Sequence, residues 1–130
     1  MAKWCRRRES GAAVTDFVLL SGLVSLIFAA VLQVGYSLHI RNTATAHAIE
    51  GARVAARADT SPIEGAIRTE SLLRSTAPGR YGIEVTSDET VINGVVVSRV
   101  TVDLPLPVLG PLGFPGTMTV TGLAYAEDQG

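Results

Sequence analysis

The chain has 130 residues, a formal net charge of −1 and a single cysteine, Cys5. This length allows one small domain, or one membrane anchor followed by one small domain. The near-neutral charge excludes the strong basic bias of a nucleic-acid-binding protein, so we expect no nucleic-acid partner. One cysteine cannot form an internal disulfide, so an exported domain of this chain has to fold without one.

The charge is distributed unevenly along the chain. Residues 1–11 carry Lys3, Arg6, Arg7 and Arg8 against Glu9 alone, so this segment is +3 and the rest of the chain is −4. A basic end placed before an apolar stretch is typical of a segment held on the cytoplasmic side of a membrane.

The apolar stretch is the 22 residues from Phe17 to Leu38, which contain no charged side chain. As a helix they span about 33 Å, close to the roughly 30 Å of a bilayer core. The stretch has almost no polar face, unlike the core helix of a globular domain, and it exceeds the apolar core of a cleavable signal peptide. We therefore predict one transmembrane helix in the cytoplasmic membrane, with lipid around it, the N-terminus inside and the C-terminus outside.

Asp16 stands at the head of this helix, where a carboxylate is costly unless it is paired or close to the headgroups. With Thr15 it could act as a helix cap. The segment Arg6–Phe17 also resembles a type IV prepilin processing site, which has a basic leader, a Gly, four small or apolar residues, an acidic residue and an apolar helix. The resemblance implies cleavage by a prepilin peptidase between Gly11 and Ala12. It also implies pairing of Asp16, at a position where the family usually has Glu, with the new α-amino group of a neighbouring subunit.

A second segment, Arg41–Arg57, is similar to the juxtamembrane region of TadE-like pilus assembly proteins. It begins with Arg-Asn, continues as an Ala-rich run and contains Glu50-Gly51-Ala52-Arg53. The resemblance implies a minor pilin or pseudopilin, a structural or priming component of a tight-adherence (Tad/Flp-type) pilus or secretion filament. Its expected partners are other pilins and the inner-membrane assembly platform. The competing hypothesis is a single-pass anchor whose extracytoplasmic adhesion or scaffold domain never assembles into a filament.

The helix is predicted to continue outward to Ala58, because no proline precedes Pro62. A stripe of mostly small residues suits packing against a partner helix or the chain's own sheet; it consists of Ile40, Ala44, Ala48, Ala52 and Ala55. Glu50 and Arg53 lie on another face at an ion-pair spacing. They form either a solvated charged face or a contact between subunits.

No motif for catalysis is present in the sequence. His39, His47 and Glu50 do not have the number or spacing of a metal site. There is also no glycine-rich phosphate loop and no nucleophile motif. We therefore expect a protein that is not an enzyme and that holds no metal or cofactor.

A second helix is expected at the start of the region 59–130. Ser61 suits the N-cap, Pro62 the first helical position and Glu64 a capping box, and Pro78-Gly79 ends the helix near Ala77. Its predicted buried face consists of Ile63, Ala66, Ile67 and Leu73.

Beyond this helix the apolar residues alternate with a period of two, which indicates strands. One run includes Tyr81, Ile83 and Val85, a longer one spans 96–104, and a last one spans 117–126. Asn93-Gly94 is a hairpin signal. The apolar loop 104–116 has four prolines, so it is expected to cover the sheet, touch the bilayer or dock a partner.

Together these elements predict an α+β protein with four segments. Residues 1–11 form a basic leader, 12–38 a transmembrane helix and 39–58 its extracytoplasmic extension. Residues 59–130 form a small extracytoplasmic domain with a short helix and an antiparallel sheet of three or four strands. A core of this size is marginal on its own, so neighbouring subunits would add stability.

Overall fold

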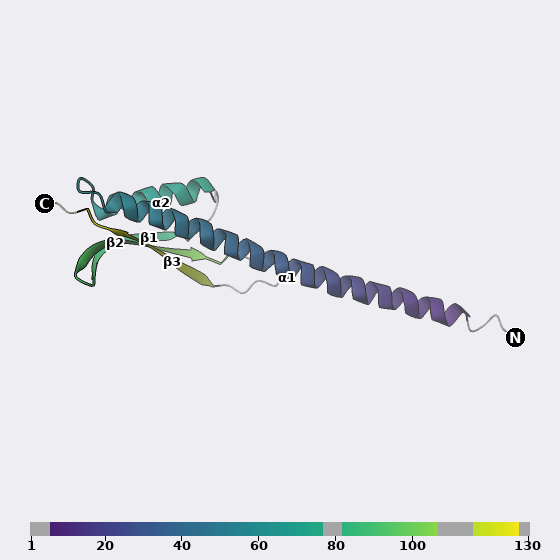
Figure 1. The fold of residues 1–130 in the computed structure, drawn as a ribbon. Helices are drawn as coiled ribbons and strands as arrows, with labels where there is room; N and C mark the ends of the chain where they lie inside the picture. The colour runs from purple at the N-terminus through teal and green to yellow at the C-terminus, as the bar shows by residue number, and fades with distance from the viewer. Residues whose placement is uncertain (1–5, 77–81, 107–115, 128–130) are drawn as a thin grey trace. The chain divides into compact units, whose positions relative to one another are not determined.

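The structure is a computed structural model that describes residues 6–76, 82–106 and 116–127, with side chains from residue 11 onward. Its elements, in chain order, are α1 (Arg6–Ala55), α2 (Pro62–Thr76), β1 (Glu84–Ile92), β2 (Val95–Pro105) and β3 (Thr117–Tyr125) (Figure 1). The strands form one antiparallel sheet in the order β1-β2-β3. The predicted α+β class, with a long apolar helix, a short helix and a small sheet, is confirmed.

The chain divides into two compact units, Met1–Gly35 and Tyr36–Gly130, and α1 contributes to both. In the first unit the described side chains of α1 are exposed almost all round the helix, including apolar ones such as Phe17, which is 72% exposed. Among the described residues, α1 is the one helix long and apolar enough to cross a membrane. It fits a single-pass membrane protein.

The C-terminal end of α1 differs from the prediction. The helix begins at Arg6, within the predicted leader, and it ends at Ala55, three residues before the predicted end at Ala58. The Thr60 hydroxyl oxygen lies within hydrogen-bond distance of the carbonyl oxygens of Val54 and Arg57, the latter at 3.1 Å, and its one hydrogen is donated to this pair. This interaction satisfies carbonyl groups that a longer helix would have used, so the chain turns after Ala55.

The core of the second unit lies between the last part of α1, α2 and the sheet. Ala44, Ala48 and Ala52 of α1 are buried there. The other buried members of the cluster are Leu73, Val100, Val102, Leu104 and Val120. The predicted stripe of small residues therefore packs against the chain's own sheet and second helix.

The sheet approaches α1 most closely at Gly122 in β3. A Cβ atom on Gly122 would overlap the backbone of Ala48 and Ile49. Glycine weakens a strand interior, and it is tolerated here because no larger residue fits against the helix backbone. The strand and helix are thus in contact through their main chains.

The β1–β2 hairpin forms as predicted. Asn93 and Gly94 both have positive φ, 53° and 82°, as a two-residue type I′ turn requires. Val96, Ser98, Val100, Val102 and Leu104 alternate along one face of β2, of which Ser98 to Leu104 are buried. The last strand ends at Tyr125, one residue before the expected end, and Tyr81 lies outside the described residues.

Helix α2 starts at Pro62 as predicted, but its buried face is partly different. Ile63 and Ile67 are 65% and 59% exposed, so their predicted burial is wrong. The buried residues are Gly65, Thr69 and Leu73. The close crossing of α2 over α1, described below, admits the small face of α2 and leaves the isoleucines outside. The predicted end at Ala77 lies outside the described residues.

Candidate functional site

The residues of the predicted processing site all lie on α1. Gly11, Ala12 and Asp16 are exposed, and the Thr15 hydroxyl donates to the Gly11 carbonyl oxygen at 3.0 Å. The helix is continuous through the Gly11–Ala12 bond. Among the described side chains the ion pairs are Glu70–Arg74 and Asp88–Arg99, so the structure gives Asp16 no cationic partner there.

Glu50 and Arg53, the predicted assembly residues, do not form an ion pair with each other in the described structure. Glu50 is half-buried and Arg53 is exposed. The two residues between them, Gly51 and Ala52, are buried. The two middle residues of this four-residue motif therefore face the core, and Glu50 and Arg53 face away from it.

Gly51 lies where α1 crosses α2. A Cβ atom on Gly51 would lie 2.6 Å from the Gly65 carbonyl oxygen, and one on Gly65 would lie 2.6 Å from Ala55 Cβ. The buried Thr69 hydroxyl bridges the helices: it is 2.9 Å from the Gly65 carbonyl oxygen and 3.3 Å from that of His47. Sequence reasoning missed this crossing, although small side chains on a helix face permit a close approach of two helix backbones.

His47 forms a second link between the two helices. Its Nε2 atom is 2.8 Å from the Thr76 hydroxyl oxygen, at the end of α2. The Thr76 hydroxyl donates to the Leu72 carbonyl oxygen at 2.8 Å, so the imidazole N–H is the donor to Thr76. Burial lowers the pKa of His47. Within the described residues no group of three or more His, Cys, Asp or Glu could hold a metal ion.

The solvent-facing side of the sheet carries polar pairs along most of its length. Arg99 of β2 donates from Nε to Asp88 Oδ1 of β1 at 3.0 Å and also from Nη2 to Oδ2. This hydrogen-bonded guanidinium lowers the pKa of Asp88. Thr119 of β3 donates to Asp103 of β2 in the same way across the neighbouring strands.

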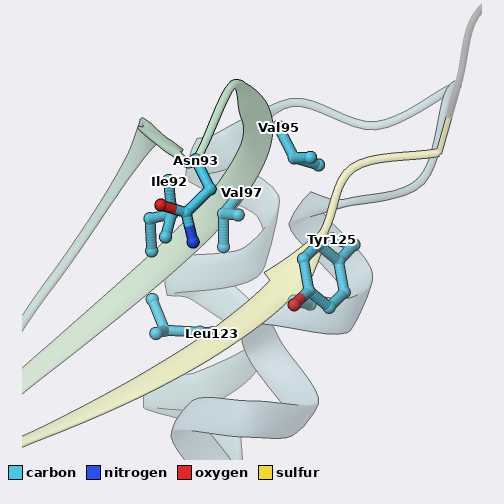
Figure 2. Close-up of a pocket in the computed structure, with 7 residues that line it drawn as sticks. Ile92, Asn93, Val95, Val97, Leu123 and Tyr125 are labelled. Carbon is cyan, nitrogen blue, oxygen red and sulfur yellow. The ribbon is translucent and has the colours of Figure 1, made fainter.

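The hairpin end of this face is apolar instead, and we call the hollow there the distal groove. It has a volume of about 200 Å³ and is lined by Ile92, Asn93, Val95, Val97, Leu123, Ala124 and Tyr125 (Figure 2). Val97 is only 2% exposed, because neighbouring side chains cover it, whereas Tyr125 is 76% exposed. Sequence reasoning did not find this groove, since it depends on the register that places Val97 beside Tyr125.

The described structure defines the class of protein coarsely: an α+β chain with one helix suited to crossing a membrane. No protein-family model, no curated protein and no solved structure matches the chain. A more specific assignment therefore depends on the residues of the two segments 6–17 and 41–57 and on the geometry described above.

Proposed function

We propose that the chain is a pilin-like subunit, a minor pilin or pseudopilin, with a structural or priming role in a tight-adherence filament. The observation that carries the proposal is the difference between the two parts of α1. Its first part exposes apolar side chains around the helix, and its last part contributes three buried alanines to the core of the small domain. An apolar helix without a polar face needs lipid or other helices around it. A subunit that passes from the bilayer into a helical filament meets both conditions.

The processing-like segment supports this role. Cleavage after Gly11 would remove the basic leader, keep the apolar helix and create an α-amino group on Ala12. Asp16 is four residues further along, one helical turn away on a similar face of α1. In a filament its carboxylate would pair with the α-amino group of a neighbouring Ala12, which offsets the cost of burying both charges. The proposed role contains no catalytic step by this chain.

The distal groove supports assembly over a lone anchor. It lies at the end of the domain near Ala55, about 22 Å further along α1 than Ile40 at 1.5 Å per residue. The bilayer that holds residues 17–38 does not extend that far along the helix. An exposed apolar hollow at this position favours contact with a neighbouring subunit.

The first test is the N-terminal residue of the mature protein. In cells with an active prepilin peptidase, we expect intact-mass and N-terminal analysis of membrane-extracted protein to give a chain that starts at Ala12. Replacing Gly11 with leucine should leave the leader in place, and Gly22→Leu, outside the processing segment, is the matched control. A mature chain that still starts at Met1 in such cells would reject the proposal.

A further inference from the structure

The second unit has one end where α2 and the three strands begin or end and where its part of α1 starts at Tyr36, and we call it the proximal end. There β1 begins, β2 ends, β3 begins and α2 ends. A narrow apolar cleft at this end is formed by α1, α2, β2 and the residue before β1. It includes Ile40, two residues after Leu38, and its lining consists of Ile40, Thr43, Ala44, Leu73, Thr76, Ile83 and Leu104.

Leu106 extends this end of the sheet beyond the cleft. Leu104 and Ile40 line the cleft together, and Leu106 follows Leu104 by two residues, about 7 Å of extended chain. Tyr36 precedes Ile40 by four residues, about 6 Å of helix. Leu106 therefore reaches about the level of Tyr36 and Leu38. All three side chains are exposed, by 38%, 38% and 53%.

Several of the described polar groups at the proximal end are paired within the chain or lie away from Leu106. The Leu106 N–H donates to the Gly116 carbonyl oxygen at 2.8 Å, and the Thr76 hydroxyl donates to Leu72. Glu84 and Asp103 lie opposite each other on the other face of the sheet, away from Leu106. Arg41 is exposed one turn after Leu38, where a long basic side chain can reach lipid phosphates.

We propose that the proximal end is a membrane-binding surface, with Leu38 and Leu106 in the lipid interface and Arg41 at the headgroups. The inference rests on the proposed membrane anchor. Leu38 ends the apolar stretch and belongs to the same compact unit as Leu106. When Leu38 lies at the boundary of the hydrocarbon core, Leu106 lies there too. The proximal end of the domain then contacts the lipid interface through these side chains.

The test uses single tryptophans in the full chain, reconstituted in phosphatidylcholine vesicles that contain brominated acyl chains. Trp4 is the only tryptophan, so the background is Trp4→Phe. We expect the emission of Leu106→Trp to shift to the blue and to be quenched. The matched control is Val91→Trp, an exposed position at the distal end of the same sheet. Its emission should remain that of a water-exposed indole without quenching.

Phe28→Trp, within the apolar stretch, tests the membrane anchor separately from the membrane-binding surface. If Phe28→Trp is quenched and Leu106→Trp behaves like Val91→Trp, the anchor stands and the membrane-binding surface is rejected. If Phe28→Trp is not quenched, the proposed anchor itself fails. Each variant is first checked for the cooperative unfolding of the parent. If Leu106→Trp does not fold, a nitroxide label is attached to Leu106→Cys in a Cys5→Ser background. The accessibility of this label to oxygen then measures the depth of position 106 in the bilayer.

Discussion

Two buried hydroxyl groups between the sheet and the helices lack hydrogen-bond partners. The Oγ atoms of Ser87 and Ser98 are inaccessible and unpaired among the described residues, and Ser98 is fully buried. An unpaired buried hydroxyl costs about 1–3 kcal/mol. The small serine side chain nevertheless suits this position, because the sheet here faces closely packed helices.

Replacing Ser98 with alanine should therefore stabilise the domain, by about 1 kcal/mol, since it removes the unpaired hydroxyl and leaves almost no cavity. The free energy of unfolding is measured by denaturant titration of the full chain in micelles. Thr86→Ala, on the exposed face of β1, removes no buried hydroxyl and should bring no such gain. A loss of stability in Ser98→Ala would show that its hydroxyl is bonded.

His47 should make the stability of the domain depend on pH. Burial lowers its pKa below the usual value of 6.5, so the unfolded chain binds a proton first as the pH falls. Above that value the imidazole is neutral in both states and adds no pH dependence. Stability should therefore decrease as the pH falls from about 7 through the lowered pKa.

Thermal unfolding between pH 7 and 5.5 measures this effect, in a range where most carboxyl groups remain ionised. His47→Gln retains an N–H donor for Thr76 but cannot be protonated there, so its melting temperature should change less over the same range. An equal slope in the parent and in His47→Gln would assign the pH dependence to other groups.

At the scale of the elements, the crossing of α1 and α2 depends on two glycines. Gly51→Ala would place a Cβ atom 2.6 Å from the Gly65 carbonyl oxygen and in overlap with Thr69. Alanine gains about 1 kcal/mol in helix propensity, but overpacking against a backbone atom costs about 1–3 kcal/mol. We expect a net loss of stability, measured by thermal unfolding. Gly35→Ala, with open space around it, should be neutral or slightly stabilising, and equal stability of both variants would contradict the crossing.

Local signals predicted most of the elements. The Asn93-Gly94 turn, the start of α2 at Pro62 and the alternation in β2 each depend on neighbouring residues and were confirmed. The end of α1 was not predictable from the absence of proline, because the Thr60 side chain completes it.

The buried face of α2 could not be read from hydrophobicity. Leu73 is buried as predicted, but Ile63 and Ile67 of the same predicted face are exposed, and the helix buries Gly65 and Thr69 instead. The choice depends on Gly51 in another helix, since two glycines together permit a backbone approach that neither specifies alone. Hydrophobic patterning of one segment does not contain that information.

At the scale of the whole molecule, the sequence motif predicted which residues form the candidate processing site. The structure adds that these residues are exposed and that the helix is continuous through them. Gly11, Ala12 and Asp16 lie on an exposed, unbroken helix, and their roles remain predictions. Their proposed partners are a peptidase and a second subunit, so one folded chain cannot contain the contacts that define the site. The distal groove could not be predicted from the sequence, because it depends on contacts within the chain that form only when the three strands pair in this register.

The charge of Asp16 is the variable that separates a filament subunit from a lone anchor. Asp16→Asn keeps the shape of the side chain and removes its charge, so we expect normal membrane insertion and loss of filament assembly. Asp16→Glu keeps the charge and should assemble. Filament yield after shearing and the membrane fraction of the subunit measure the two effects. Normal assembly or function of Asp16→Asn would favour an anchor with an adhesion or scaffold domain.

The contact between Gly122 and the backbone of α1 also determines when the domain can fold. The ribosome makes α1 first and β3 last, so the wall of the core exists long before the strand that closes it. The core can be completed only after Tyr125 has been synthesised. If the domain is exported during synthesis, the residues that precede β3 can cross the membrane before the core closes.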